Sequence, residues 1–252
     1  MVTPVAADSP RQLRHEAQRL EILAAAADAI AEHGFHGMSM RGLARATGNG
    51  LATFYNYFSS KEDLLFSLQT DAFETMTRSV NAALEGVAEH VDRLYVFVLQ
   101  HLQYSAEHRS VMRVLVHEAS ALPAGRRKTV RLLKEGYFNV CRDILAAILA
   151  DADDAAGLDL AEVERVTYSV FGMLNWSYGW YDPTQHGSPE DVAKTIHSLA
   201  VCGLGCAYRA ARGERPRRRM AGAAPALAGR LGCNPAALKK RPAPAEKNVK
   251  RV

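Results

Sequence analysis

The most constraining feature of this sequence is three helical patterns packed into fewer than fifty residues. Apolar residues at helical spacing predict a first helix over about 12–33, which Gly34 ends. Ser39 can cap a second, short helix over about 40–47, and a glycine-containing break separates it from a third over about 51–58. Two short helices joined by a glycine turn and braced by a longer helix can place the later one in a DNA major groove.

The composition of the third helix supports this interpretation. Phe54 and Phe58 are four residues apart and can face the supporting helices. No carboxylate or histidine lies within a turn of the polar residues, which disfavours proton-transfer chemistry. Hydroxyls and an amide are left for phosphate oxygens and base edges, from Thr53, Tyr55, Asn56 and Tyr57.

The rest of the chain up to residue 212 also follows helical periodicity, and no run alternates as a strand would. Ser59 and Glu62 stand at capping-box spacing before the next apolar run, which predicts a fourth helix there. The fold class is therefore all-α, with further helices of a length that can enclose a ligand. We expect these helices over 64–86, 90–107, 109–121, 124–150 (broken by Gly136), 161–180 and 189–212, with a polar loop over 151–158.

The net charge of +4 is unevenly distributed. Residues 213–252 carry eleven Lys or Arg against two Glu, a net charge of +9, whereas residues 1–212 carry −5. This proline-containing segment has few large apolar residues, so we expect a basic disordered tail. Its role is either a solvated extension or sequence-independent attraction to nucleic-acid phosphates.

Patterns typical of other protein classes are missing from the sequence. There is no apolar run long enough to span a membrane and no secretory signal, so we expect a cytoplasmic protein with no membrane partner. Neither nucleotide-binding loops nor G-x-S-x-G or H-E-x-x-H motifs occur, and Cys and His do not cluster at metal spacing. We therefore predict no catalytic residues, no metal site and no cofactor, and a protein that is not an enzyme.

The segment from Phe35 to Leu65 resembles the DNA-binding motif of the TetR/AcrR family of bacterial transcriptional regulators. The similar residues run from Phe35 to Ala44, then Gly48, then from Thr53 to Leu65. The resemblance implies that DNA phosphates are bound by Ser39, Arg41, Tyr55 and Lys61. It also implies contacts to DNA bases or the adjacent backbone from Leu51, Thr53, Asn56 and Tyr57. The small core of the motif would be formed by Leu43, Ala44, Phe54 and Phe58. Departures from the family pattern are Asn49, Gly50 and Leu51 at the start of the third helix.

The resemblance also implies a domain order and a homodimer. We expect a flexible N-terminal arm over 1–11, a helix-turn-helix DNA-binding domain over 12–62, an effector-binding and dimerisation domain over 63–212, and the tail over 213–252. In relatives the last two long helices pair with those of a second subunit. The apolar face of the last helix is compatible with such pairing and equally with an ordinary core; it comprises Val192, Ile196, Leu199, Ala200, Gly203 and Ala207.

Both tryptophans lie in the aromatic segment 172–183. Trp176 and Trp180 are one helical turn apart and can fill the core or a dimer interface. They can also wall a ligand pocket near that interface, in which Asn175 and Tyr178 orient the ligand.

This segment resembles a branch of the family that responds to acyl-CoA thioesters, which implies an acyl-CoA effector. Its phosphates would need cations, for which Arg109 and Arg113 are candidates. The cluster Arg126, Arg127, Lys128 and Arg131 offers further cations, although a solvated helix face explains such a run as well.

Together these features predict a homodimeric, ligand-responsive repressor that binds an inverted-repeat operator in double-stranded DNA and is released by a small effector. The alternative is a constitutive, sequence-independent nucleic-acid-binding protein that acts through its basic tail.

Overall fold

The computed structural model describes residues 9–152 and 160–211, and every regular element in these ranges is a helix. The predicted all-α class is confirmed. The elements are α1 (Pro10–Gly37), α2 (Met40–Ala46), α3 (Leu51–Tyr57), α4 (Lys61–Leu84), α5 (His90–Glu107), α6 (Arg109–His117), α7 (Ala124–Ala152), α8 (Leu160–Asn175), α9 (Ser177–Trp180), α10 (Pro183–His186) and α11 (Pro189–Ala211). The predicted basic tail and most of the predicted N-terminal arm lie outside the described residues.

Helix α1 begins at Pro10, so the last two residues of the predicted arm are helical rather than flexible. Ser9 caps the helix, because its Oγ accepts a hydrogen bond from the Gln12 backbone N–H (3.3 Å). The Ser9 N–H donates in turn to Gln12 Oε1 (2.7 Å), and proline at the first helical position needs no hydrogen-bond partner. Gly34 breaks the helical path near its other end with φ of 72°, as the sequence predicted.

Helices α1 to α3 and the start of α4 share a small apolar core. The four residues predicted to hold it, Leu43, Ala44, Phe54 and Phe58, are all buried. Leu20, which helical spacing assigned to the apolar face, is half exposed, because the buried stripe of α1 runs along a different line. That stripe comprises Ile22, Leu23, Ala26, Ala27 and Ile30.

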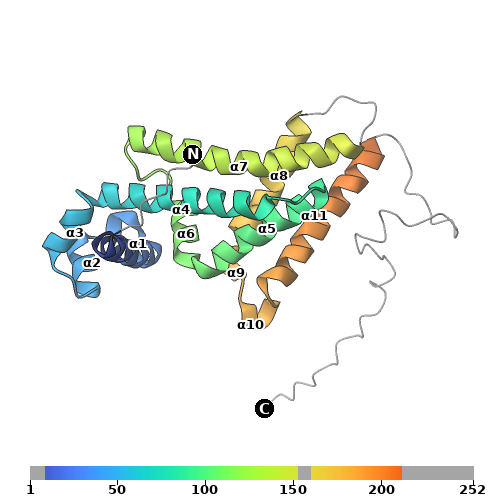
Figure 1. The fold of residues 1–252 in the computed structure, drawn as a ribbon. Helices are drawn as coiled ribbons and strands as arrows, with labels where there is room; N and C mark the ends of the chain where they lie inside the picture. The colour runs from blue at the N-terminus through green and yellow to red at the C-terminus, as the bar shows by residue number, and fades with distance from the viewer. Residues whose placement is uncertain (1–8, 153–159, 212–252) are drawn as a thin grey trace, which may run out of the picture. The chain divides into compact units, whose positions relative to one another are not determined.

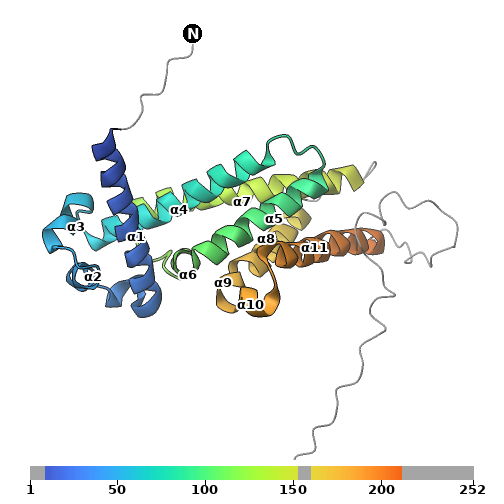
Figure 2. The ribbon, with the colours of Figure 1, turned by 60° about the horizontal axis from the view of Figure 1, so that its bottom comes forward.

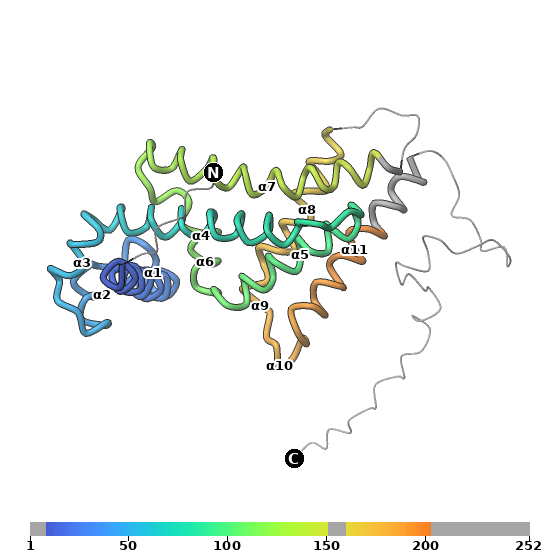
Figure 3. Tube along the Cα trace, in the orientation of Figure 1, coloured from blue at the N-terminus to red at the C-terminus, as the bar shows by residue number. Residues whose placement is uncertain are grey.

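Helix α4 leads from the short helices into the bundle, as Figure 1 shows. Its N-cap is Ser60, whose Oγ accepts from the Asp63 N–H (3.1 Å), one residue later than the predicted pair of Ser59 and Glu62. Helix α1 runs steeply across α4 (Figure 2), whereas α5 and α7 run along it (Figure 3). Helix α8 packs on α7 and covers a further side of the buried core of the bundle.

Two predicted helix boundaries differ from the structure. Helix α7 continues through Gly136, where a Cβ would meet open space, so this glycine is an exposed position rather than a break. The predicted helix over 161–180 is divided at Trp176 into α8 and the single turn α9.

The chain forms two compact units, one ending at His197 and the other beginning at Ser198. The predicted boundary between residues 62 and 63 falls inside α4, which crosses it as a continuous helix. Helix α4 therefore joins α1 to α3 to the bundle without a break.

Candidate nucleic-acid interface and effector site

The turn between α2 and α3 is a Schellman motif centred on Gly48. The Asn49 N–H donates to the Ala44 carbonyl (3.0 Å), and the Gly48 N–H donates to the Arg45 carbonyl (3.3 Å). Gly48 has φ of 67°, a conformation that glycine adopts without the steric cost of a Cβ. The break predicted at 48–50 is thus a defined turn that fixes the direction in which α3 leaves α2.

Helix α2 begins at the predicted cap. Ser39 Oγ accepts from the Gly42 N–H (3.1 Å), and a Cβ on Gly42 would lie 3.0 Å from that oxygen. Glycine therefore leaves room for the capping hydroxyl. Ser39 is exposed, so the same hydroxyl is open to an external acceptor such as a phosphate oxygen.

Helix α3 is amphipathic in the way the sequence predicted. Phe54 is fully buried, whereas Tyr55 is 52% exposed and Asn56 is also exposed. Leu51 and Thr53, which were predicted to face bases or backbone, are half-buried at the start of the helix. The phenol and the amide that the sequence singled out are thus presented to solvent from a fixed helix.

Two predicted DNA contacts are already engaged within the protein. Tyr57 donates from its hydroxyl to Gln18 Oε1 (2.9 Å), and its ring lies 4.5 Å from that of His15. Lys61 donates from Nζ to the Phe35 carbonyl (3.3 Å) and lies over the Phe35 ring. Both side chains brace α1 against α3 and α4.

Arg41 is an exposed guanidinium at the first turn of α2. In the described part of the chain it has no ion pair. It is therefore available to an anion.

The tryptophans lie on the surface of the chain. Trp176 is 60% exposed and Trp180 is 41% exposed. Their exposure excludes a role in the core of this chain. The interpretation that they wall a ligand pocket near the dimer interface stays a prediction. Asn175 beside them is half-buried.

The other predicted effector residues separate into two places. Tyr178 is buried, and its hydroxyl lies 2.5 Å from His117 Nε2, while Arg109 Nε donates to the Tyr178 carbonyl (2.6 Å). These contacts fasten α9 to α6. Arg113 instead lines a cavity between α1 and α6, apart from the tryptophans.

A buried aromatic cluster that the sequence interpretation did not single out lies between α5, α7 and α8. His101, which is only 1% exposed, bonds through Nδ1 to the Tyr137 hydroxyl (3.2 Å), and its ring contacts Phe171. His101 Nε2 is buried without a hydrogen-bond partner in the described structure. Burial lowers the pKa of His101 to about 4, so the imidazole is neutral at pH 7.

A row of rings joins this buried histidine to the surface. Phe171 stacks on Phe138 with centroids 5.3 Å apart, and Phe138 lies 4.8 Å from the exposed Tyr168. The aromatic residues of this cluster come from three helices: 97 from α5, 137 and 138 from α7, and 168 and 171 from α8. Only the packing of these helices brings them together. Helical spacing alone could not have indicated this cluster.

An ion pair between described residues ties the first turn of α7 to the start of α4. Arg126 at the first turn of α7 contacts Asp63 Oδ1 (2.7 Å) and lies over the Phe66 ring. Partial burial opposes ionisation of Asp63, but hydrogen bonds from Ser59 and the Arg126 charge together hold its pKa below the usual value. Arg126, a candidate cation for an effector phosphate, is therefore already neutralised.

Within residues 9–152 and 160–211, no three His, Cys, Asp or Glu side chains are grouped to hold a metal ion. Over the same part of the chain, no helix combines the length and apolar character that a membrane span needs.

Family models match two segments of the chain. Residues 22–68 match the model described as bacterial regulatory proteins of the tetR family. Residues 87–204 match the model described as a tetracyclin repressor-like C-terminal domain. The first match contains α2 and α3 entirely, and the second contains most of the bundle.

Individual relatives agree with these models. The chain is 24% identical to the fatty acid metabolism regulator protein of Bacillus subtilis over 186 residues, which cover 73% of this chain and 94% of that protein. A TetR-family transcriptional regulator from Bordetella parapertussis has 27% identity and a TM-score of 0.67, with 74% of this chain and 95% of that one covered. AibR, solved in complex with isovaleryl coenzyme A and operator DNA, has 21% identity and a TM-score of 0.62, covering 72% and 97%.

Proposed function

This chain belongs to the TetR family of bacterial regulatory proteins, and on that premise we propose that it is a homodimeric repressor released from its operator by an acyl-CoA thioester. The observation that carries the DNA-binding part is α3, which displays Tyr55 and Asn56 to solvent from a buried phenylalanine core. We assign no catalytic residues to it, and we expect it to act in the cytoplasm, where bacterial DNA is located.

The exposed groups of α2 and α3 divide into positioning and reading roles. Arg41, Ser39 and Tyr55 supply a guanidinium and two hydroxyls suited to phosphate oxygens. Asn56 supplies an amide that can bond the N6 and N7 edge of an adenine in the major groove. In the chain without DNA, Tyr57 and Lys61 bond to α1 and hold α3 and the start of α4 in place behind these exposed groups.

Two copies of α3 must lie about 34 Å apart to enter successive major grooves of an inverted repeat. A second subunit is therefore needed, and α8 offers a surface for it. Large exposed apolar side chains occur on α8 and at α9, namely Leu160, Tyr168, Trp176 and Trp180. On α11, Val192 and Ile196 are buried within this one chain, whereas Leu199 of the same predicted face is 60% exposed. We assign the tryptophans to the subunit contact, since a partner would remove these exposed indole rings from water.

The acyl-CoA assignment is supported by the names of the relatives, one a fatty acid metabolism regulator and one solved with isovaleryl coenzyme A. We place the acyl chain along the aromatic row from Tyr168 to His101, whose packed rings would separate to admit it. When Tyr137 donates its hydroxyl proton to Nδ1, His101 Nε2 carries the ring proton and can donate to a thioester carbonyl oxygen. Effector binding there would act on α4 through α5 and α7, which pack along it.

The alternative of a sequence-independent protein acting through its tail is not supported by these relatives, which are named as regulators. The segment on which that alternative depends, residues 213–252, lies outside the described residues.

Fluorescence anisotropy with the DNA upstream of its own gene, against scrambled DNA at fixed salt, tests the DNA-binding part. Asn56→Ala should weaken binding and relax base preference at one operator position, at a cost of about 1–3 kcal/mol on the cognate site. Tyr55→Phe should weaken cognate and scrambled DNA equally, because a phosphate contact carries no sequence information. Equal losses on both DNAs for Asn56→Ala would remove its reading role.

Adding acyl-CoA thioesters of increasing chain length to the same assay tests the effector. His101→Phe should reduce effector-driven release and leave operator binding unchanged, while His108→Phe, at an exposed histidine outside the row, serves as the matched control. Release by no thioester would sink the acyl-CoA assignment and leave the DNA-binding assignment standing.

Sedimentation velocity tests the subunit contact. Trp176→Ala should weaken the dimer, whereas Leu132→Ala, an exposed leucine on α7, should not. A Trp176→Ala protein that stays dimeric but loses its response to effector would return the indole to a ligand pocket.

A further inference from the structure

The cavity between α1 and α6 is lined by side chains of opposite charge and by apolar side chains. It is open to solvent on one side and has a volume of about 160 Å³, about half the lower limit for pockets that hold drug-sized ligands. It is therefore too small for an acyl-CoA. Its apolar wall is formed by Ile30, Ala31 and Val114.

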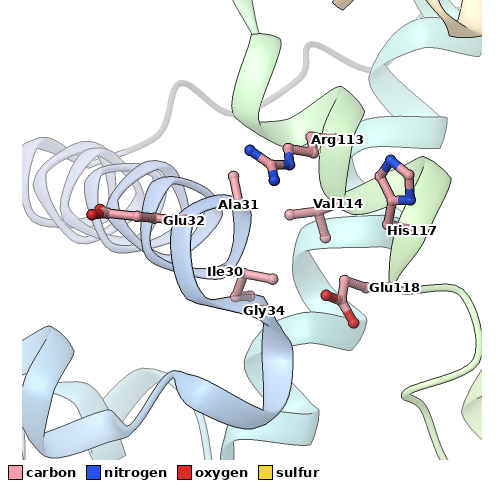
Figure 4. Close-up of a pocket in the computed structure, with 8 residues that line it drawn as sticks. All are labelled: Ile30, Ala31, Glu32, Gly34, Arg113, Val114, His117 and Glu118. Atoms are coloured by element: carbon pink, nitrogen blue, oxygen red, sulfur yellow. The ribbon is translucent and has the colours of Figure 1, made fainter. Parts of the chain in front are cut away.

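Opposite charges face this cavity without pairing with each other. Figure 4 shows the Arg113 guanidinium on one side of Val114 and the Glu118 carboxylate on the other, with the Glu32 carboxylate turned away from α6. In the described part of the chain no ion pair joins Arg113 to Glu118 or to any other carboxylate. The cavity therefore keeps a positive and a negative group apart across an apolar surface.

Glu118 is held in place for this role. Its Oε1 accepts from the Phe35 N–H (3.1 Å), and its backbone carbonyl accepts from Gln69 Nε2 (3.3 Å). Its other carboxylate oxygen, Oε2, makes no hydrogen bond to a described residue. One wall thus presents a fixed, partly unsatisfied acceptor, and the opposite wall presents a guanidinium with five N–H donors.

We propose that this cavity binds a zwitterionic amino acid with a small apolar side chain. The ligand carboxylate would pair with Arg113, the ammonium group would pair with Glu118, and the side chain would lie on Ile30 and Val114. A simple carboxylate would satisfy only Arg113 and leave a second carboxylate nearby, whereas a zwitterion matches both charges. The site is separate from the proposed effector row around His101.

The position of the cavity gives such binding a consequence. Glu118 contacts the backbone directly after the Gly34 break of α1, while the neighbouring His117 holds Tyr178 of α9. A ligand here would touch the joint between the DNA-binding helices and the bundle, so its occupancy can alter how firmly α1 is held against α6.

Isothermal titration calorimetry of the full chain with valine, isovalerate (valine without its ammonium group) and isobutylamine (valine without its carboxylate) tests the proposal. Valine should bind at least about tenfold more tightly than either single-charge analogue, because each lost charge-assisted hydrogen bond is worth about 1.5–3 kcal/mol. Equal binding of an analogue and valine would overturn the zwitterion assignment. Absence of binding by valine and by alanine at millimolar concentration would overturn the site itself.

Substitutions of Arg113 and Glu118 test the role of each charge in valine binding. Arg113→Met and Glu118→Gln should each weaken valine binding about tenfold or more, and the glutamine retains an oxygen to accept from the Phe35 N–H. Arg78→Met, at an exposed arginine outside the cavity, is the matched control and should bind valine as the unaltered chain does. Unchanged binding by Arg113→Met would exclude this site. If either cavity variant fails to fold, the comparison of valine with its analogues on the unaltered chain still decides.

Discussion

Replacing His101 should change how the stability of this protein depends on pH. The imidazole is fully buried, and burial lowers its pKa from 6.5 to about 4. In the unfolded chain the same side chain titrates with its ordinary pKa. Between these two values the unfolded state binds one more proton than the folded state, so stability falls as the pH is lowered.

The magnitude follows from the two pKa values. They differ by about 2.5, and one pH unit of such a difference corresponds to about 1.4 kcal/mol, so His101 alone should remove about 3 kcal/mol between pH 6.5 and pH 4. Above pH 6.5 both states hold a neutral imidazole and the effect vanishes. Below about pH 4 both states are protonated and the loss levels off.

Urea unfolding at fixed protein concentration, from pH 7.5 to pH 4, measures how His101 contributes to the unfolding free energy. Other groups titrate in the same range, so the informative quantity is the difference in unfolding free energy between the unaltered protein and His101→Phe. That difference should move by about 3 kcal/mol in favour of the variant as the pH falls from 6.5 to 4. His101→Leu should give the same pH dependence, because it removes the same titrating group, although its packing cost differs.

A difference that stays constant across this range would refute the reasoning. It would mean that the folded protein accommodates a charged imidazole at position 101, through water or a rearranged Tyr137 hydroxyl. The proposed acyl site around His101 would then be hydrated rather than apolar.

Three further predictions concern the DNA-binding helices and their link to the bundle. Ser39→Ala removes the cap on the Gly42 N–H and should lower the unfolding free energy by about 1 kcal/mol, measured by thermal unfolding. Gly48→Ala introduces a Cβ at φ of 67° and should cost about 1–2 kcal/mol, and a neutral result would show that the turn relaxes. Arg126→Met breaks the partly exposed ion pair with Asp63 and should lower the unfolding free energy by no more than about 1 kcal/mol. This loss should shrink at high salt, because salt screens the pair. A loss that does not depend on salt would show that Arg126 acts by packing on the Phe66 ring.

The fold was largely predictable from local signals. Apolar spacing, capping residues and glycines placed α1 to α4 to within a few residues, because these effects act within one or two turns of the chain. Gly34 and Gly48 were recognisable as breaks for the same reason, since both take a positive φ. The family resemblance of the segment around α2 and α3 also came from contiguous residues.

The roles of individual side chains depended on contacts between distant segments. Tyr57 and Lys61 have the chemistry of DNA contacts, yet Gln18 and Phe35 engage them. Trp176 and Trp180 have the composition of a pocket wall, but the division of the predicted helix at Trp176 leaves both exposed.

The sequence alone thus determined the helices, the turn between α2 and α3, and the polar face of α3, all of which follow from residues near one another in the chain. Only the tertiary structure decided that His101 is buried in a ring cluster and that Arg113 and Glu118 face one cavity. The physical reason is that burial and charge pairing are set by which helices pack together, and helical periodicity gives the apolar face of each helix without naming its neighbour.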